Sequence, residues 1–330
     1  MDDKLISDVL DRQGFGSNVQ LVAEENDCLV LRLEAPTGEG YMTMYHVMPG
    51  VFIMFNEFHL ESCKSECQDM DMVFCIDHCR QGRMEHENSI YGKYYMESGD
   101  IRIDTRAHHS GNENMPTKYY HGVTIGFQPE LAENTINRES LGFNVDIKEI
   151  FGRFIRDDKE FLMRRDLLLK NDEAFIKIFD ELYSVPKDIR IDFYKVKVLE
   201  ILLRLRMIEA SGYMNEKRYI PVSQAEKIKQ IYRFIIDRPD KNYTLEELSD
   251  RFRVPQSTLR KNFSLIYGSP IYKYVKNYKM NLAAEMLIND KDMKISDIAE
   301  NVGYDNPSKF SAAFKDVMGV TPMTYKSNNS

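Results

Sequence analysis

The chain has 330 residues, enough for two or three domains, and its 43 % hydrophobic and 29 % charged residues are typical of a soluble globular protein. No apolar run approaches the ~20 residues of a membrane-spanning helix, and the acidic start, Met1 to Lys4, lacks the apolar core of a signal peptide. We therefore expect a cytoplasmic protein without a membrane partner. The net charge of −8 is uneven: residues 1–221 carry −12, whereas Val222 to Ser330 carry +4, as expected of a protein that contacts nucleic-acid phosphates with one domain only.

Residues from about 19 to 130 are predicted to form β-strands. Residues 41–47 and 51–58 flank a Pro-Gly turn and are predicted to be paired strands. Ser98-Gly99-Asp100 resembles the turn of cupin-type barrels. Many short strands separated by turns indicate a barrel or sandwich, and we predict a cupin-like β-barrel. Further short strands are expected at 72–79, 83–87, 101–105 and 122–127.

Residues from about 145 to 212 are predicted to be helical. Apolar residues recur at helical spacing from Lys159 to Tyr183, before a Val-Pro break, and again from Asp192 to Ala210, before a Ser-Gly break. The second helix is apolar over a broad face, which suggests burial on two sides. It is either a core helix or a dimer face, and the two are not exclusive. Residues 219–223 form a plausible junction, so we predict a sensor and dimerisation domain over 1–221 and a second domain over 222–330.

The second domain repeats itself. Residues 245–252 match residues 295–302 at an offset of 50, with apolar residues at i, i+3 and i+7 and a small residue at i+4. The small residue lets a second helix cross close by, as a helix-turn-helix requires. Residues 257–263 then match residues 308–314 at an offset of 51, so the second turn is predicted to be one residue longer. Gly268 and Gly319 close the two units.

Local signals define the helix ends in this domain. Thr244 and Glu247 are predicted to form a capping box. Asn306 is a predicted N-cap followed by proline at the first helical position, and Pro255 lies where the first recognition helix should begin. Between the repeats, Pro270 to Asn289 is predicted to be one helix of ~30 Å, close to the ~34 Å repeat of duplex DNA.

The segments 303–315 and 319–325, with Gly303-Tyr304, Asn306-Pro307 and Gly319-Val-Thr-Pro322 among their residues, resemble the signature of the AraC family of transcription regulators. The resemblance covers about residues 226–326 and implies a seven-helix DNA-binding domain with two recognition helices. The chain departs from the pattern at Pro255, in place of a Ser-type cap, and at Ala312, where some members carry a long polar residue. By position in that pattern, the residues implied to face DNA are Gln256, Ser257, Arg260, Lys261, Ser308, Lys309 and Ser311.

These residues have different expected roles. Arg260 is the best candidate for reading a guanine, because its fork of donors matches two acceptors on one base edge. Lys261 and Lys309 are expected to contact phosphates. The alternative for each of them is a solvated surface charge.

An enzymatic role is not expected for the N-terminal part. A metal-dependent cupin would need His-x-His with a following Glu, but His86 has no second histidine at i+2. His108 and His109 are adjacent and would point to opposite faces of a strand. We therefore expect no catalytic residues, no metal ligands and no cofactor.

The five cysteines support a metal or redox sensor only weakly. An odd count in a chain without a signal peptide argues against disulfides. His59, Cys63 and Cys67 are four apart but lie in a predicted loop, while Cys75 and Cys79 would be ~13 Å apart on a strand, too far to chelate one ion. The simpler interpretation is that the cysteines are small buried or half-buried residues without a chemical role. The cysteines are Cys28, Cys63, Cys67, Cys75 and Cys79.

The favoured hypothesis is a regulator that binds double-stranded DNA and is switched by a small-molecule effector in the N-terminal domain. A barrel rich in Met, Phe and Tyr can enclose an apolar pocket, although the same residues can simply fill a core, so no ligand-binding residues are assigned. Alternatively, the N-terminal domain serves only dimerisation or the binding of a protein partner. A homodimer is expected, with RNA polymerase as a further partner if the protein is an activator.

Overall fold

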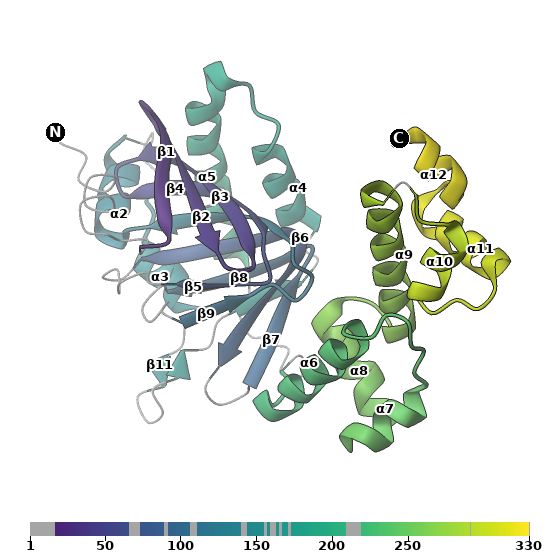
Figure 1. Cartoon of the computed structure of the whole chain (residues 1–330). Coiled ribbons are helices and arrows are strands. Elements are labelled where there is room, and N and C mark those ends of the chain that lie inside the picture. Colours follow the sequence, from purple (N-terminus) through teal and green to yellow (C-terminus); the bar gives the residue numbers. More distant parts are fainter. Residues whose placement is uncertain are drawn as a thin grey trace. The chain divides into compact units, whose positions relative to one another are not determined.

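Figure 1 shows the chain in a computed structural model. The structure describes residues 17–65, 73–88, 92–105, 111–139, 144–154, 157–158, 163–164, 167–170, 173–208, 219–290 and 292–329. The chain divides into an N-terminal unit, residues 1–87 with 94–218, and a C-terminal unit, residues 88–93 with 219–330. No helix in the described residues is long and apolar enough to cross a membrane.

A curled antiparallel sheet dominates the N-terminal unit (Figure 1). Its strands follow the order β1-β2-β3-β4-β10-β6-β8-β13, while β5 pairs with β9 and β7 pairs with β6. A register shift between Leu21 and Ala23 marks a bulge in β1. The strands are β1 (Val19–Glu25), β2 (Cys28–Ala35), β3 (Gly38–Met48), β4 (Val51–His59), β5 (Ser62–Ser65), β6 (Phe74–Asn88), β7 (Gly92–Glu97), β8 (Asp100–Thr105), β9 (Gly111–Asn114), β10 (Tyr120–Phe127), β11 (Asp157–Asp158), β12 (Met163–Arg164) and β13 (Leu167–Lys170).

The two faces of this sheet bury different side chains. Because side chains alternate along a strand, Val123 and Ile125 of β10 point to one face and Thr124 to the other. The first face shares a large apolar core with the helices, in which Phe179 and Tyr194 are fully buried. Each such side chain stabilises the fold by roughly 1.5–3 kcal/mol. The helical elements of this unit are α2 (Pro129–Glu139), α3 (Ile147–Gly152), α4 (Glu173–Leu182), the 3-10 turn η1 (Lys187–Ile189) and α5 (Arg190–Met207).

Helix α5 is apolar on two sides, as predicted. Val198, Leu202 and Leu205 are fully buried in the core of the unit, so the interpretation as a core helix is confirmed. The other side leaves Val196 61 % exposed and Met207 83 % exposed. This exposed apolar side has no role in the core of its own unit.

Several predicted strands are confirmed, and one predicted helix is wrong in part. The strands at 41–47 and 51–58 are β3 and β4, joined through Gly50 in a positive-φ turn. Of the strands predicted at 72–79 and 83–87, residues 74–79 and 83–87 belong to the single long strand β6, and residue 72 lies outside the described residues.

The helix predicted from Lys159 begins only at Glu173, because residues 167–170 form β13 and pair with β8; residues 159–162 lie outside the described residues. A run of three leucines fits a strand or a helix equally well, so its spacing could not decide between them. The cupin-like identity of the sheet stays a prediction.

The described residues of the C-terminal unit form seven helices, the number that the family resemblance implies. Two helix-turn-helix motifs, α7 with α8 and α10 with α11, are connected by the long helix α9, which was predicted over almost the same residues. We call them the first and the second motif. The helices are α6 (Val222–Ile236), α7 (Leu245–Phe252), α8 (Gln256–Tyr267), α9 (Ile271–Asn289), α10 (Ile295–Asn301), α11 (Pro307–Met318) and α12 (Pro322–Asn328).

Candidate nucleic-acid interface

The first motif is built on a capping box and a tight turn. The Thr244 hydroxyl accepts from the Glu247 backbone N–H at 3.1 Å, and the Glu247 carboxylate accepts from the Thr244 N–H at 2.8 Å, as predicted. Helix α7 ends at Phe252, and the next residue, the C-cap Arg253, has a left-handed φ of 52°. Pro255 then takes the N-cap position of α8 without a side-chain cap bond, because proline offers no side-chain acceptor. Leu248 and Phe263 are buried in this motif.

The second motif uses a different cap for the same purpose. The Asn306 side-chain oxygen accepts from the N–H of Ser308 at 2.8 Å and of Lys309 at 3.2 Å, and Pro307 is the first helical residue, as predicted. Ala299 is fully buried, which fits the expectation that a small residue there lets α11 cross close to α10. The start of α8 lies 11 residues after that of α7, and the start of α11 lies 12 residues after that of α10, so the second turn is one residue longer.

The predicted DNA-facing residues of α8 lie on its exposed surface. Gln256 and Ser257 occupy the first turn, while Arg260 and Lys261 follow one turn later. Ser257, Arg260 and Lys261 stand at i, i+3 and i+4, a spacing that places them on one side of a helix. Among the described residues, the guanidinium of Arg260 and the ammonium of Lys261 make no hydrogen bond or ion pair, so both can contact an external acceptor.

The predicted residues of α11 are arranged similarly but offer less charge. Ser308 and Lys309 are exposed and Ser311 is half-buried. The ammonium of Lys309 has no partner among the residues that the structure describes. Ala312 is exposed and offers no polar atom, so this helix presents a single cation in its first two turns.

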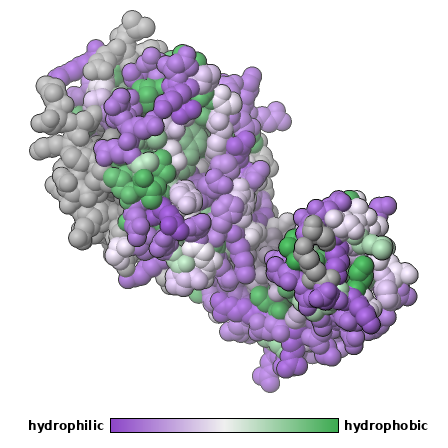
Figure 2. All heavy atoms as spheres, turned by 45° about the horizontal axis from the view of Figure 1, so that its top comes forward, coloured by the Kyte–Doolittle hydropathy of each residue, from purple (hydrophilic) through white to green (hydrophobic). Residues whose placement is uncertain are grey.

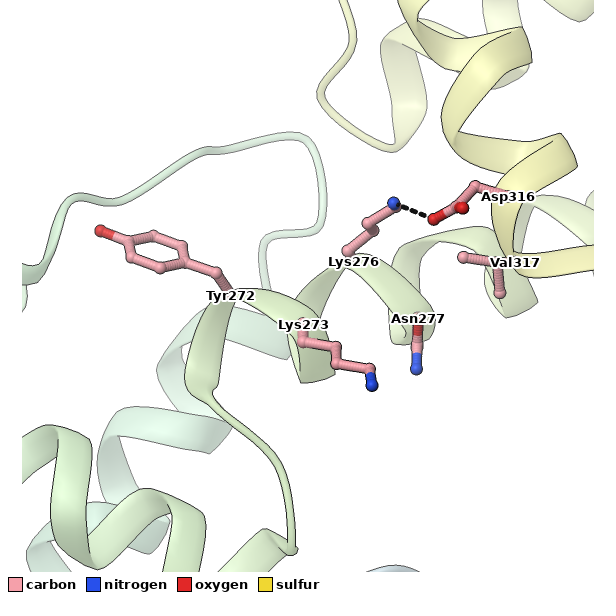
Figure 3. Close-up of a pocket in the computed structure, with 6 residues that line it drawn as sticks. All are labelled: Tyr272, Lys273, Lys276, Asn277, Asp316 and Val317. Atoms are coloured by element: carbon pink, nitrogen blue, oxygen red, sulfur yellow. Dashed lines mark hydrogen bonds and ion pairs between the residues drawn. The ribbon is translucent and has the colours of Figure 1, made fainter.

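A depression lies beside the connecting helix, between α9 and α11 (Figure 3). This open depression has a volume of about 610 Å³. Lys276 on α9 and Asp316 on α11 form an ion pair at its wall, with an N–O distance of 2.5 Å. The backbone N–H of Leu245 donates to the Tyr272 hydroxyl at 3.1 Å, so α9 also supports the start of α7. The residues that line the depression are Tyr272, Lys273, Lys276, Asn277, Asp316 and Val317.

Sequence reasoning missed one group in this unit. Lys279, in the middle of α9, is buried and hydrogen-bonded to the loop before α7. Its position four residues before the buried Ala283 and four after the half-buried Val275 is the only local signal that it faces inward.

Of the four described cysteines of the N-terminal unit, Cys63, Cys75 and Cys79 are buried and Cys28 is half-buried. Burial raises the pKa of the Cys63 thiol to about 12 and raises the pKa of Cys79 further, so neither is a thiolate near neutral pH. Cys63 lies in β5 rather than in the predicted loop. Within the described residues, no three or more His, Cys, Asp or Glu side chains gather as metal ligands would. Cys67, His108 and His109 lie outside the described residues.

Comparison with known proteins supports these observations for the C-terminal unit. A family described as a helix-turn-helix domain matches residues 248–328. A Streptomyces lividans protein named as an AraC-like transcription regulator is 33 % identical over 88 residues, which are 27 % of this chain and 29 % of that protein. An HTH-type transcriptional regulator of Bacillus subtilis is 20 % identical over 138 residues, 42 % of this chain and 47 % of that protein. This chain thus spans less than half the length of both relatives.

One solved structure with similarity to this region is the C-terminal domain of AraT, a response regulator from Geobacillus stearothermophilus. It is 29 % identical to this chain over 31 % of this chain and 84 % of that one, with a TM-score of 0.30.

Proposed function

Residues 248–328 are a helix-turn-helix domain of the AraC type, and on this premise we propose that the protein is a sequence-specific transcription regulator that binds duplex DNA. The observation that carries the proposal is the pair of motifs whose recognition helices, α8 and α11, expose basic side chains that have no partner within the described part of the chain. In this role Arg260 reads a base edge, and Lys261 and Lys309 contact phosphates. Gln256, Ser257, Ser308 and Ser311 supply polar contacts around them.

The test begins with selection of bound duplexes from a random pool by the full-length protein, followed by titrations of the selected duplex. Arg260→Ala is expected to weaken binding by about 1–3 kcal/mol and to relax one base position. Lys309→Ala is expected to weaken selected and random duplexes equally and to lower the salt slope by about 1. Lys195→Ala, which removes one exposed charge on α5 of the N-terminal unit, is the matched control. Salt-independent binding, or no binding, would refute the proposal.

We propose further that the N-terminal unit, as a cupin-like barrel, binds a small-molecule effector on the sheet face opposite the helices. Buried polar side chains converge there: the Thr124 hydroxyl donates to the Asp77 carboxylate at 2.7 Å, and the Asn56 amide donates to Thr124 at 3.2 Å. Arg102 lies 3.5 Å from Asp77. Apolar residues of the same face, among them Met42 and Met96, are grouped nearby in the core. A few polar groups within an apolar lining are typical of small-molecule sites.

A thermal-shift screen of the full-length protein against metabolites tests the effector proposal, followed by DNA titrations with each hit. An effector changes DNA affinity only if it binds one arrangement of the protein better than the other. A compound that raises the melting temperature and changes DNA affinity supports the proposal. If no compound does both, the N-terminal unit serves dimerisation or a protein partner.

We propose that the protein is a homodimer and that α5 forms the contact. Ile189, Val196 and Leu203 are exposed and follow one another at intervals of seven residues, and the exposed Met207 lies one helical turn after Leu203. Figure 2 shows apolar patches on a largely hydrophilic surface. A heptad spacing of apolar residues is typical of paired helices. If the protein activates transcription, RNA polymerase is the expected further partner.

The exposed positions of α5 give the sharper test of dimerisation. Leu202 is fully buried in the unit's own core, so a charge there would disrupt folding. Val196→Glu with Leu203→Glu instead places charges at exposed sites and should give folded monomers. Sedimentation measures the association and circular dichroism the fold, with Lys195→Glu as the control. A folded variant that still sediments as a dimer would exclude α5 as the interface.

A further inference from the structure

Lys279 is an unusual residue in α9, because its charged head is buried. The side chain is 3 % exposed and lies beside Met280 and Ala283, which belong to the apolar core around α10 and α11. Its Nζ donates to the Lys241 carbonyl at 2.9 Å and to the Asn242 side-chain oxygen at 2.7 Å. Burial lowers the pKa of Lys279, and the nearby Asp240 charge opposes this shift. The two hydrogen bonds replace contacts that the ammonium would otherwise make with water.

The same loop contacts the second motif. The Asn242 amide nitrogen donates to the Gly303 carbonyl at 2.7 Å, immediately after α10. Gly303 has a φ of +78°, and a Cβ there would lie 2.9 Å from both the Asp240 carbonyl oxygen and the Lys279 Nζ. Only glycine fits this close approach in this conformation.

These contacts connect three parts of the domain. Lys241 and Asn242 precede α7 of the first motif, Lys279 lies on the connecting helix, and Gly303 follows α10 of the second motif. The Lys279 ammonium is therefore held between the loop of one motif and the turn of the other. Hydrogen bonds from a charged donor are stronger than neutral ones, so removing this donor takes two strong hydrogen bonds away from the loop before α7.

We propose that Lys279, with Asn242 and Gly303, is a positioning group that fixes the orientation of α8 relative to α11 and so sets the spacing between the two DNA segments that one chain accepts. This proposal rests on the proposed DNA-binding function. One added base pair moves the second segment ~3.4 Å along the duplex and rotates it by about a tenth of a turn, so only a stiff domain discriminates between spacings.

The first test needs no DNA. Spin labels carried by a ketone-bearing amino acid, which leaves the native cysteines untouched, are placed at the exposed Asp250 of α7 and Ser327 of α12 in the full-length protein. The label-to-label distance distribution should be narrow in the parent protein. It should broaden or shift with Lys279→Met, which keeps the aliphatic stem, and with Asn242→Ala, which changes an exposed loop residue. Lys279→Arg should restore it in part.

Lys276→Met is the matched control, because it makes the same change one turn earlier on α9 and removes only the Lys276–Asp316 ion pair. Circular dichroism shows whether each variant is folded. If Lys279→Met and Asn242→Ala are folded and give the parent distribution, the positioning role is wrong, whatever the DNA results are.

The second test measures spacing on the duplex selected by the parent protein. Inserting one base pair between the two contacted segments should weaken the parent protein about tenfold or more, comparable with a mismatch in the site. Lys279→Met should lose most of this penalty while it binds a duplex that holds one segment as the parent does. An unchanged penalty would overturn the proposal. A parent protein that selects no duplex would refute the DNA-binding function instead and leave the distance measurement to decide on the positioning.

Discussion

His78 on β6 should make the N-terminal unit sensitive to mild acid. Its side chain is 1 % exposed, and its ring stacks on Phe179 of α4 with centroids 4.6 Å apart. Neither ring nitrogen has a hydrogen-bond partner among the described residues. Burial, assisted by the nearby Arg80 charge, lowers the pKa of His78 from its ordinary 6.5 to about 4. The folded unit therefore holds this histidine neutral where the unfolded chain would protonate it.

The sign of the effect follows from proton linkage. Between pH 6.5 and about 4, the unfolded chain binds a proton at His78 that the folded unit does not, so stability falls as the pH falls through this window. The difference between the two pKa values of His78 corresponds to about 3 kcal/mol of stability, since one pKa unit is worth about 1.4 kcal/mol. About 2 kcal/mol of this stability should be lost by pH 5. Above pH 7 the effect should be negligible.

The assay is urea unfolding of the full-length protein from pH 7 to pH 5, followed by far-ultraviolet circular dichroism. His78→Phe keeps an aromatic ring against Phe179 but cannot be protonated, so the transition of the N-terminal unit should lose its His78-dependent slope. His121, whose pKa is also lowered by burial, contributes equally to both proteins and cancels in the comparison. Equal pH slopes for the parent and the variant would show that His78 is not the group that titrates.

Two further outcomes are expected from the described packing. Thr244→Ala removes the capping box of α7 and should cost about 1 kcal/mol in chemical unfolding of the C-terminal unit, whereas Thr324→Ala on the exposed side of α12 should cost less; equal costs would contradict the cap argument. A Cβ at Gly126 would lie 2.1 Å from ring atoms of Phe52, so Gly126→Ala should lower stability by about 1–3 kcal/mol, measured as a lower melting temperature, while an unchanged value would mean that the ring moves without cost.

The C-terminal motifs were predictable because their signals are local. The capping box at Thr244 and the cap at Asn306 act within three residues, so the sequence contains both partners of each hydrogen bond. The small Ala299 and the closing Gly319 are likewise signals that the local sequence contains. No local sequence signal, however, indicates which groups the Lys279 ammonium contacts, because its two acceptors lie 37 and 38 residues away in the sequence.

The N-terminal unit was harder to predict because its decisive contacts are distant. Strand β13 exists because Leu167 pairs with Ile103 on β8, and no helical spacing rule contains that partner. Similarly, α5 is apolar on both sides, and only the packed sheet decides that Val198 is core and Val196 is not. Predictions from periodicity therefore described the presence of these segments better than their packing.

Each of the two units consists of segments that are separate in the sequence, and this affects where the gene can be truncated for expression. The C-terminal unit includes residues 88–93, where Lys93 and Ile220 exchange backbone hydrogen bonds at 2.8 and 2.7 Å and the Lys93 ammonium pairs with Glu226 at 2.7 Å. A fragment that starts at Val222 loses this strand pairing, and among the described residues it leaves Lys229 as the one cation paired with Glu226. A rearranged fragment, in which a short glycine-serine linker joins residues 88–93 to Tyr219, would keep this pairing within one polypeptide. Truncations chosen at the linear junction alone would understate the stability of the isolated C-terminal unit.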